Sequence, residues 1–310
     1  MKHQQSSVYV DLQQYQLHVR RLIPLQGALS PVLYLHGAIE NGRIFYSNSG
    51  KGLACYLADQ GFIGYCADFA GRGLSQPSLS TGFNQSQHQV ITRDIPALIE
   101  FVYQQHQQPL TVIAHSWGGV LLAASLARFP ELLCKVRAKV YFGTKRVISV
   151  RSLERKIKID WLWSRFAPWL GRKYGYIPAR KWGFGADNEP TEFLTDTINW
   201  INGAPFADLT DGFDYAAASQ QTDWPPSWHF AAVNDTVLGH PVDVQHFINE
   251  TGQQDGKYIL LGRAAGYLHD YDHISMLTHP KATEDHFIQL NQWLVDLPES
   301  AEHSGQAAAT

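Results

Sequence analysis

The sequence is short of cysteine, of long apolar runs and of net charge, and each shortage excludes a class of protein. Its three cysteines are odd in number and widely spaced, which argues against a disulfide framework and against a metal knuckle. No apolar run approaches the roughly 18 residues of a membrane span, and residues 1–14 lack the apolar core of a signal peptide. A net charge of −3 over 310 residues gives no basic footprint for nucleic acid. We therefore expect a cytoplasmic protein with no nucleic-acid partner.

Short apolar runs alternate along the chain with amphipathic helical patterns. Six runs are apolar almost throughout: 31–37, 61–69, 110–116, 138–144, 227–235 and 257–262. Such runs are typical of strands covered on both faces of a parallel sheet. Helical patterns are found at 52–60, 94–105, 118–130 and 242–250, and a last helix is expected to begin at Pro280. With the apolar–polar alternation around residues 8–22, the sequence predicts an α/β fold: a mostly parallel sheet, an N-terminal antiparallel hairpin and helices on both faces.

The alternation stops between about residues 145 and 222, which we interpret as an inserted helical cap. The core is then expected to comprise residues 1–144 and 223–298, followed by a disordered tail at 299–310. Five of the nine tryptophans lie in the insert. Its charges are segregated: residues 145–181 carry eleven Lys and Arg against two acidic residues, whereas residues 185–223 carry eight acidic residues and no Lys or Arg.

Two interpretations of this segregation are open. In the first, the two halves of the cap fold on each other and pair their charges. In the second, the basic, Trp-rich half faces an anionic membrane surface or an acidic substrate, which predicts a weak contact between the cap and membranes.

Residues 111–120, TVIAHSWGGV, end an apolar run on a serine and follow it with two glycines. A strand that ends on a serine, turns at once and enters a helix holds the hydroxyl exposed on a sharp elbow. The segment from Ala114 to Gly118 resembles the Gly-x-Ser-x-Gly elbow of the α/β-hydrolase superfamily, with alanine in place of the first glycine. The resemblance covers nearly the whole chain apart from the insert and the tail. The alternative is a serine that caps a helix after a buried strand.

In this superfamily an acid and then a histidine follow the nucleophile, each on a loop after a strand. The resemblance therefore implies Ser116 as the nucleophile, Asp235 as the acid and His273 as the base. A serine hydroxyl needs such a base because it barely ionises near neutral pH. Alternatives stay open for two of the roles. They are Asp214, Asp223 and Asp243 for the acid and His269, which is nearer the preceding strand, for the base.

The same resemblance implies two backbone N–H donors for the negative charge on the substrate carbonyl oxygen. They are those of Trp117, directly after the nucleophile, and of Ala38, with Ile39 as the alternative to Ala38. The two histidines of HDYDH have the i, i+4 spacing of metal ligands on a helix, but their surroundings indicate a loop and no further ligands complete a site. Residues 68–75 lack the third glycine of a dinucleotide fingerprint and are interpreted as a structural turn. We expect no metal and no cofactor.

These features predict a serine hydrolase that cleaves a carboxylic ester or thioester through an acyl-enzyme intermediate. An aromatic cap favours a small-molecule substrate with a lipid-like or medium-chain acyl group. Amidases and peptidases, carbon–carbon hydrolases, acyltransferases and perhydrolases use the same triad, so the fold does not decide among them. A dehalogenase is disfavoured because that chemistry needs an aspartate at the elbow. The alternative from another class is a protein that binds a ligand on this fold without catalysis.

Overall fold

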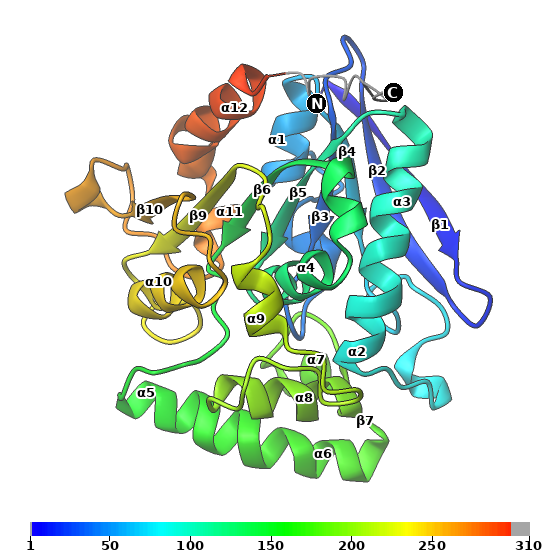
Figure 1. Ribbon diagram of the computed structural model, residues 1–310, viewed down its shortest axis with the longest axis vertical. Coiled ribbons are helices and arrows are strands. Elements are labelled where there is room, and N and C mark those ends of the chain that lie inside the picture. The colour runs from blue at the N-terminus through cyan, green and yellow to red at the C-terminus, as the bar shows by residue number, and fades with distance from the viewer. Residues whose placement is uncertain (1, 299–310) are drawn as a thin grey trace, which may run out of the picture.

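An eight-stranded sheet runs through the protein, whose computed structural model describes residues 2–298 (Figure 1). The strand order is β1-β2-β4-β3-β5-β6-β9-β10, with β1/β2 and β2/β4 antiparallel and all other neighbours parallel. The strands are β1 (His3–Asp11), β2 (Gln16–Pro24), β3 (Pro31–Leu35), β4 (Ile63–Ala67), β5 (Leu110–His115), β6 (Val136–Phe142), β9 (Ser227–Ala232) and β10 (Lys257–Leu261). The predicted hairpin and the six predicted strands are confirmed.

Side chains of the central strands alternate between two apolar cores, one on each face of the sheet. In β3, Leu33 and Leu35 enter the first core and Val32 and Tyr34 enter the second. Helices α3 and α4 cover the first face, and α1, α11 and α12 cover the second (Figure 1). This burial on both faces explains why the strands read as continuous apolar runs, and the α/β fold with helices on both faces is confirmed.

The helices of the described core are α1 (Leu53–Asp59), α2 (Gln87–Gln89), α3 (Ile95–His106), α4 (Trp117–Arg128), α10 (Pro241–Glu250), α11 (Ser275–Thr278) and α12 (His286–Asp296). Of these, α1, α3, α4 and α10 lie close to their predicted positions, whereas α2 and α11 were not predicted. Short 3-10 helices are η1 (Gly42–Ile44), η2 (Leu79–Thr81), η4 (Pro130–Lys135), η6 (Arg263–Ala265) and η7 (Pro280–Glu284). The segment η3 (Val90–Asp94) is a π-helix between α2 and α3. The last helix was predicted to begin at Pro280, which is wrong. Asp285, at φ −129° and ψ −119°, separates the short turn η7 from α12.

Residues 145–222, named the insert, connect β6 to β9 and form a helical layer across one end of the molecule (Figure 1). Its elements are α5 (Leu153–Arg155), η5 (Lys156–Phe166), α6 (Ala167–Tyr174), β7 (Tyr176–Ile177), α7 (Ala179–Trp182), β8 (Glu189–Pro190), α8 (Thr191–Ile201) and α9 (Tyr215–Gln220). The first three follow one another without a break in helical backbone. No helix in residues 2–298 is long and apolar enough to cross a membrane.

The two halves of the insert are held together by apolar packing. Ala167, Ile177 and Ala179 from residues 145–181 pack with Leu194 from the second half. No ion pair of the described chain joins residues 145–181 to residues 185–223. The expected pairing of charges between the halves is therefore wrong. The predicted tail at 299–310 lies outside the described residues.

Candidate active site

Ser116 stands alone between strand β5 and helix α4, in a backbone conformation that few residues adopt. Its φ is +50° and its ψ −122°, a region that costs a non-glycine residue free energy of order 1–3 kcal/mol. The hydrogen bond from its N–H to the Phe142 carbonyl, 2.8 Å long, fixes this turn to the neighbouring strand β6. The strain is thus held by the surrounding structure, as expected of an elbow that exposes a side chain.

The two glycines after the nucleophile are required by close backbone and side-chain approach. A Cβ on Gly118 would lie 2.3 Å from the His36 carbonyl oxygen, and a Cβ on Gly119 would lie 2.2 Å from Thr144 Oγ1. Neither position has room for a methyl group. The first of these distances is to a backbone atom, so no side-chain movement relieves it.

Asp235 and His273 lie on the loops after β9 and β10 and form a buried pair. His273 Nδ1 donates to Asp235 Oδ2 over 2.5 Å. Burial lowers the pKa of His273 below 6.5, and Asp235 opposes that shift only in part. Burial would raise the pKa of Asp235, but the charge and hydrogen bond of His273 outweigh it and lower that pKa. The pair therefore holds an ionised carboxylate against an imidazole that stays neutral at neutral pH.

Ser116 and His273 line one cavity but are not hydrogen-bonded to each other in residues 2–298. Within the described residues, Ser116 Oγ accepts one hydrogen bond, from Lys145 Nζ over 3.5 Å, and Lys145 lines the same cavity. Catalytic hydrogen bonds in unliganded enzymes are often longer than in the substrate complex, so this geometry leaves the pair competent to meet when substrate binds.

Two backbone N–H groups beside Ser116 face the cavity without a partner within the described chain. They belong to Ala38 and Trp117, the donors proposed from the sequence. The N–H of Ile39, the alternative donor, is instead engaged by the Glu189 carboxylate. Ala38 and Trp117 therefore supply two N–H donors that have no partner within the described chain.

The cavity has a volume of about 630 Å³ and walls that are largely apolar. That volume is within the range of pockets that enclose small organic ligands. Its apolar walls come mostly from the insert and the loop after β9: Ile148, Ile159, Leu162, Trp163, Phe184, Ile201 and Leu238.

Residues 30–196, more than half the chain, match the family model described as serine aminopeptidase, S33. The chain belongs to this family. It is an α/β-hydrolase enzyme. No curated protein has a significantly similar sequence.

Solved structures share the fold of this hydrolase at low sequence identity. A soluble variant of monoglyceride lipase from Saccharomyces cerevisiae, in complex with a substrate analog, is 16% identical with a TM-score of 0.69 over 96% of each chain. A bromoperoxidase from Bacillus anthracis is 14% identical, with a TM-score of 0.59 over 94% of this chain and 98% of its own. An esterase from Rhodococcus sp. ECU1013 is 13% identical, with a TM-score of 0.58 over 96% and 100%. These structures support the fold and leave the reaction open.

Sequence reasoning missed a second histidine–acid pair that lies against His273. The Nδ1 of His115 donates to Glu40 Oε2 over 2.8 Å, and its Nε2 donates to the His273 carbonyl over 2.9 Å. Because both ring nitrogens face acceptors only, the ring is an imidazolium. Burial opposes this charge, but Glu40 outweighs it and raises the pKa of His115, while the pKa of Glu40 falls to about 2.

Lys145 is the other residue of the hydrolase's site that sequence reasoning missed. It was counted only as the first of the basic residues of the insert. Its side chain is buried in the cavity beside Ser116, and burial lowers its pKa to about 8. Its place three residues after the apolar run of β6 was the available signal, because that edge of the sheet carries the nucleophile and the base.

The alternative acids and base do not line the cavity that holds Ser116. His269 stacks on His279 with ring centroids 4.1 Å apart, and Asp214 caps helix α9 through the Ala217 N–H. Asp243 accepts from Ser149, and Asp223 is exposed. The structure thus brings His273, bonded to Asp235, rather than these alternatives to the cavity that holds Ser116.

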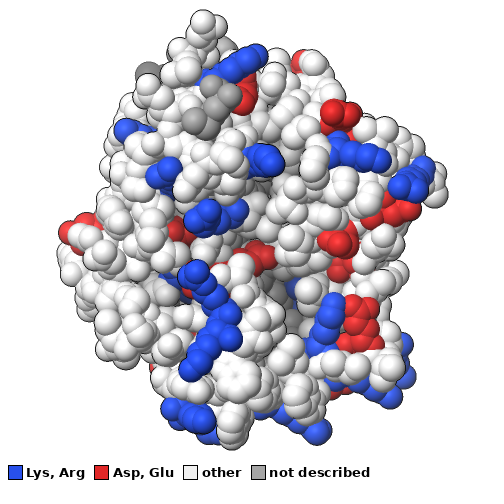
Figure 2. Space-filling model, turned by 180° about the vertical axis from the view of Figure 1, so that it is seen from behind, with Lys and Arg blue, Asp and Glu red and all other residues white. Residues whose placement is uncertain are grey.

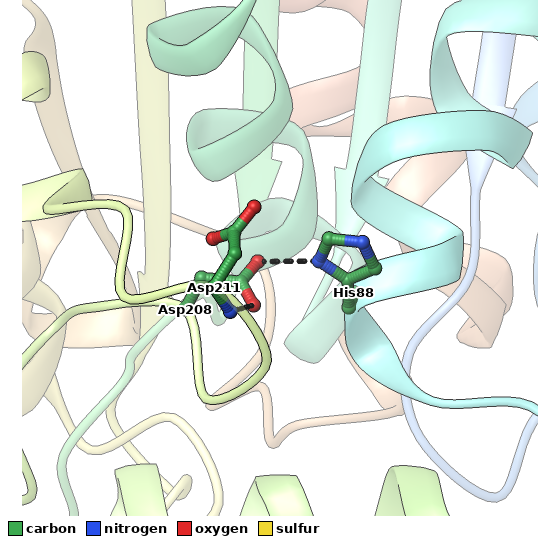
Figure 3. A group of neighbouring side chains, drawn as sticks. All are labelled: His88, Asp208 and Asp211. Atoms are coloured by element: carbon green, nitrogen blue, oxygen red, sulfur yellow. Dashed lines mark hydrogen bonds and ion pairs between the residues drawn. The ribbon is translucent and has the colours of Figure 1, made fainter.

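His88, Asp208 and Asp211 are close enough to one another to resemble a metal site (Figure 3). His88 Nδ1 donates to Asp208 Oδ2 over 2.9 Å, as Figure 3 shows. The Arg128 guanidinium already contacts both carboxylates, and the Tyr215 hydroxyl donates to Asp208. We interpret the group as an ion-pair network that joins the insert to the core.

Proposed function

We propose that this hydrolase cleaves a carboxylic ester or thioester through an acyl-enzyme intermediate, with Ser116, His273 and Asp235 as its triad. The observation that carries the proposal is their arrangement in one cavity. A strained serine lines that cavity together with His273, whose imidazole is bonded to Asp235, and with two residues whose N–H groups have no partner within the described chain. A serine that only capped a helix would require neither the pair nor the free donors.

The residues divide the reaction as follows. His273 Nε2 takes the proton of Ser116 Oγ as that oxygen bonds to the substrate carbonyl carbon, while Asp235 holds the imidazole through Nδ1. The N–H groups of Ala38 and Trp117 donate to the carbonyl oxygen as it gains negative charge. Collapse breaks the bond to the leaving alkoxide or thiolate, which receives the proton from His273. Water, activated by the same imidazole, then releases the acid and restores Ser116.

The substrate class follows from the cavity. Its apolar walls favour a lipid-like or medium-chain acyl group. The family's name includes aminopeptidases, but an aminopeptidase must hold a substrate ammonium. Lys145 carries positive charge beside Ser116, and the nearby Glu40 is already bonded to His115, so this cavity disfavours such a substrate.

Labelling by a fluorophosphonate probe tests the proposal. Native protein is expected to be labelled at Ser116, Ser116→Ala to lose all labelling, and Ser80→Ala, at an exposed serine, to keep it. His273→Ala should label far more slowly. Labelling that is lost in Ser116→Ala but unchanged in His273→Ala would assign the base to another residue. If folded native protein is not labelled, the ligand-binding alternative is favoured.

A panel of p-nitrophenyl esters of increasing acyl length, with matching thioesters and anilides, then tests the bond and chain length. The rate should rise as the pH increases through the pKa of His273, because only the neutral imidazole accepts the serine proton. Since burial lowers this pKa, the midpoint is expected below pH 6.5.

A further inference from the structure

Lys145 has a buried ammonium with too few partners. Its Nζ faces the cavity, and its one hydrogen bond within the described chain is the 3.5 Å contact with Ser116 Oγ. The carboxylates nearest to it have other partners. Asp235 accepts from His273, Glu40 from His115 and Asp243 from Ser149, and none forms an ion pair with Lys145 in residues 2–298.

A second buried lysine, Lys139, has partners for its ammonium and serves as a comparison. Lys139 Nζ donates to Gln253 Oε1 over 2.6 Å and lies 3.6 Å from the centre of the Trp224 ring. Lys145 has only the Ser116 hydroxyl as an acceptor, at 3.5 Å, and lies farther, 5.7 Å, from the Trp117 ring. A buried cation with one long hydrogen bond and no carboxylate partner destabilises the folded protein, so its position next to the nucleophile points to a ligand that supplies the missing negative charge.

The position of Lys145 separates it from the oxyanion donors. Ser116 follows β5, while Ala38 follows the neighbour β3 on one side and Lys145 follows the neighbour β6 on the other. The ammonium therefore approaches Ser116 from the side opposite the Ala38 donor. The Lys145 ammonium would therefore contact a part of the substrate other than the reacting carbonyl oxygen.

We propose that Lys145 binds an anionic group of the substrate, a carboxylate or phosphate near the scissile bond. The proposal rests on the proposed function and narrows its substrate to an anionic ester with an apolar chain. The apolar walls hold the chain, and Lys145 donates to the anionic oxygens.

Two matched substrate pairs test this subsite. Mono-p-nitrophenyl glutarate against p-nitrophenyl butyrate places a carboxylate on the acyl side, and 1-acylglycerol 3-phosphate against 1-acylglycerol places a phosphate on the alcohol side. Native enzyme should have a higher kcat/KM for the anionic member of at least one pair. Lys145→Met should lower that anionic-to-neutral ratio by about tenfold or more, as expected for a lost hydrogen bond to a charged group.

Controls distinguish this proposal from the proposed function. Lys145→Arg keeps the charge and should retain the preference, and Lys281→Met, at an exposed lysine outside the cavity, should retain it fully. Equal losses for both members of both pairs in Lys145→Met, or no preference in native enzyme, would overturn the subsite. Failure to hydrolyse any ester would instead overturn the proposed function.

The outer face of the insert carries a separate feature, an exposed aromatic cluster. The stacked rings of Trp161 and Phe166 lie 5.4 Å apart, and Trp169 and Trp182 pack against Phe166 at 5.8 and 5.4 Å. All three tryptophans are about half exposed. Further apolar side chains of the same helical run are also exposed: Leu153 and Ile157.

Unpaired basic side chains surround this cluster. Six of them are exposed and have no ion pair within the described chain: Lys156, Arg165, Arg172, Lys173, Arg180 and Lys181. Figure 2 shows Lys and Arg gathered at the end of the molecule that the insert forms. The opposite side of the same helix, at Ile159, Leu162 and Trp163, lines the cavity.

The geometry points to docking of this face on a bilayer that contains anionic lipid. Tryptophan at a membrane interface, apolar side chains beneath it and lysines around it are the components of interfacial binding. Basic residues near such a surface are attracted by its anionic lipids. A docked helix would place the cavity wall next to the lipid that supplies the substrate.

Co-sedimentation with vesicles tests the docking, independently of any hydrolysis. The protein should bind phosphatidylcholine–phosphatidylglycerol vesicles, bind phosphatidylcholine vesicles more weakly, and lose affinity as salt increases. The triple variant Trp161→Ala/Trp169→Ala/Trp182→Ala should bind about tenfold more weakly or worse. A control, Leu25→Ala/Leu268→Ala, changes exposed apolar residues outside the insert and should bind as native. Equal binding by the triple variant and native protein, or no binding to anionic vesicles, would contradict the proposal.

Discussion

The two halves of the insert have opposite charge and opposite relations to the core. The acidic half, residues 185–223, is bonded to the core along its length. Glu189 pairs with Arg72 in a fully buried contact, Asp187 accepts from Asn41 over 2.8 Å, and Asp211 pairs with Arg128. The basic half is bonded to the core only near its start. There Arg146 pairs with Glu250, whereas the five basic side chains from residue 165 to 181 have no ion pair in residues 2–298.

The two halves of the insert therefore have different structural roles. The acidic half fixes the loop that follows β3, because Glu189 accepts from the Ile39 N–H and the Asp187 N–H donates to the Ile39 carbonyl. That loop carries the Ala38 N–H, one of the two proposed oxyanion donors. The basic half covers the cavity and presents its charges to the surroundings. The acidic half therefore attaches the insert to the core, whereas the basic half keeps its charges exposed.

The largest expected effect comes from breaking the buried pair of the acidic half. Arg72→Met leaves the Glu189 carboxylate buried without its cation, so we expect a loss of about 3–5 kcal/mol in the free energy of unfolding. Urea denaturation followed by circular dichroism measures it. Adding Glu189→Gln should recover part of the loss, since the buried charge is then gone. Arg263→Met, at an exposed arginine, is the control, and an equal stability for Arg72→Met and native protein would contradict the assigned attachment.

A smaller effect is expected on catalysis when Asp187 is removed. Asp187 accepts from the Gly73 N–H and from Asn41 Nδ2, so Asp187→Ala frees the loop after β3 on one side. If the Ala38 N–H is an oxyanion donor, kcat should fall by about tenfold while KM changes little, because misplacing a donor acts on the transition state. Steady-state kinetics on one ester separates the two constants. Asp187→Asn keeps one acceptor oxygen and should recover part of kcat, whereas a rise in KM alone would indicate a role in binding.

The sequence allowed prediction of features that depend on local pattern. Apolar runs marked the parallel strands because burial on both faces removes the need for polar residues. The serine and its following glycines marked the elbow, because close packing there excludes larger residues. The resemblance to the α/β-hydrolase superfamily implied Asp235 and His273 on the loops after β9 and β10, and the structure brings the two side chains into contact.

Features that depend on tertiary partners could not be predicted. Lys145 looked like one more basic residue of the insert, and only its burial beside Ser116 distinguishes it. Glu189 is one of the eight acidic residues of the insert, but it pairs with Arg72 of the core, which is 117 residues away in sequence. His115 and Glu40 are 75 residues apart and have no shared motif.

The acidic half should also respond to pH at Asp196. Burial raises the pKa of this carboxyl to about 6, despite the hydrogen bond that it accepts from the Gln87 N–H. The folded state thus holds the proton more tightly than the unfolded state, and stability is lost as the pH rises from about 4 through about 6. Asp196→Asn removes this loss and can still accept from Gln87. We expect it to be more stable than native protein at pH 7.5, by about 1 kcal/mol after allowance for its partial exposure, and equal at pH 4.

Asp211→Asn is a matched variant whose change in stability at pH 7.5 is expected to have the opposite sign. The hydrogen bond from Arg128 lowers the pKa of Asp211 to about 2, so its contribution to stability is present above about pH 4 and lost as the pH falls through 2. Asp211→Asn should therefore be less stable than native protein at pH 7.5, and the difference should shrink in acid. Thermal unfolding across pH 3–8 measures both variants. The same sign for both would contradict the inferred difference between the two carboxyls.

The smallest expected effect belongs to the basic half. Arg172→Gln/Lys173→Gln removes two exposed charges that have no acid partner in the described chain, so the free energy of unfolding should change by no more than about 0.5 kcal/mol. Urea denaturation beside Arg72→Met gives the comparison directly. A loss above 1 kcal/mol would show that these charges stabilise the fold. Unchanged stability together with weaker binding to anionic vesicles would indicate that these charges act in membrane binding, because they would then contribute to an interaction outside the chain and not to the fold.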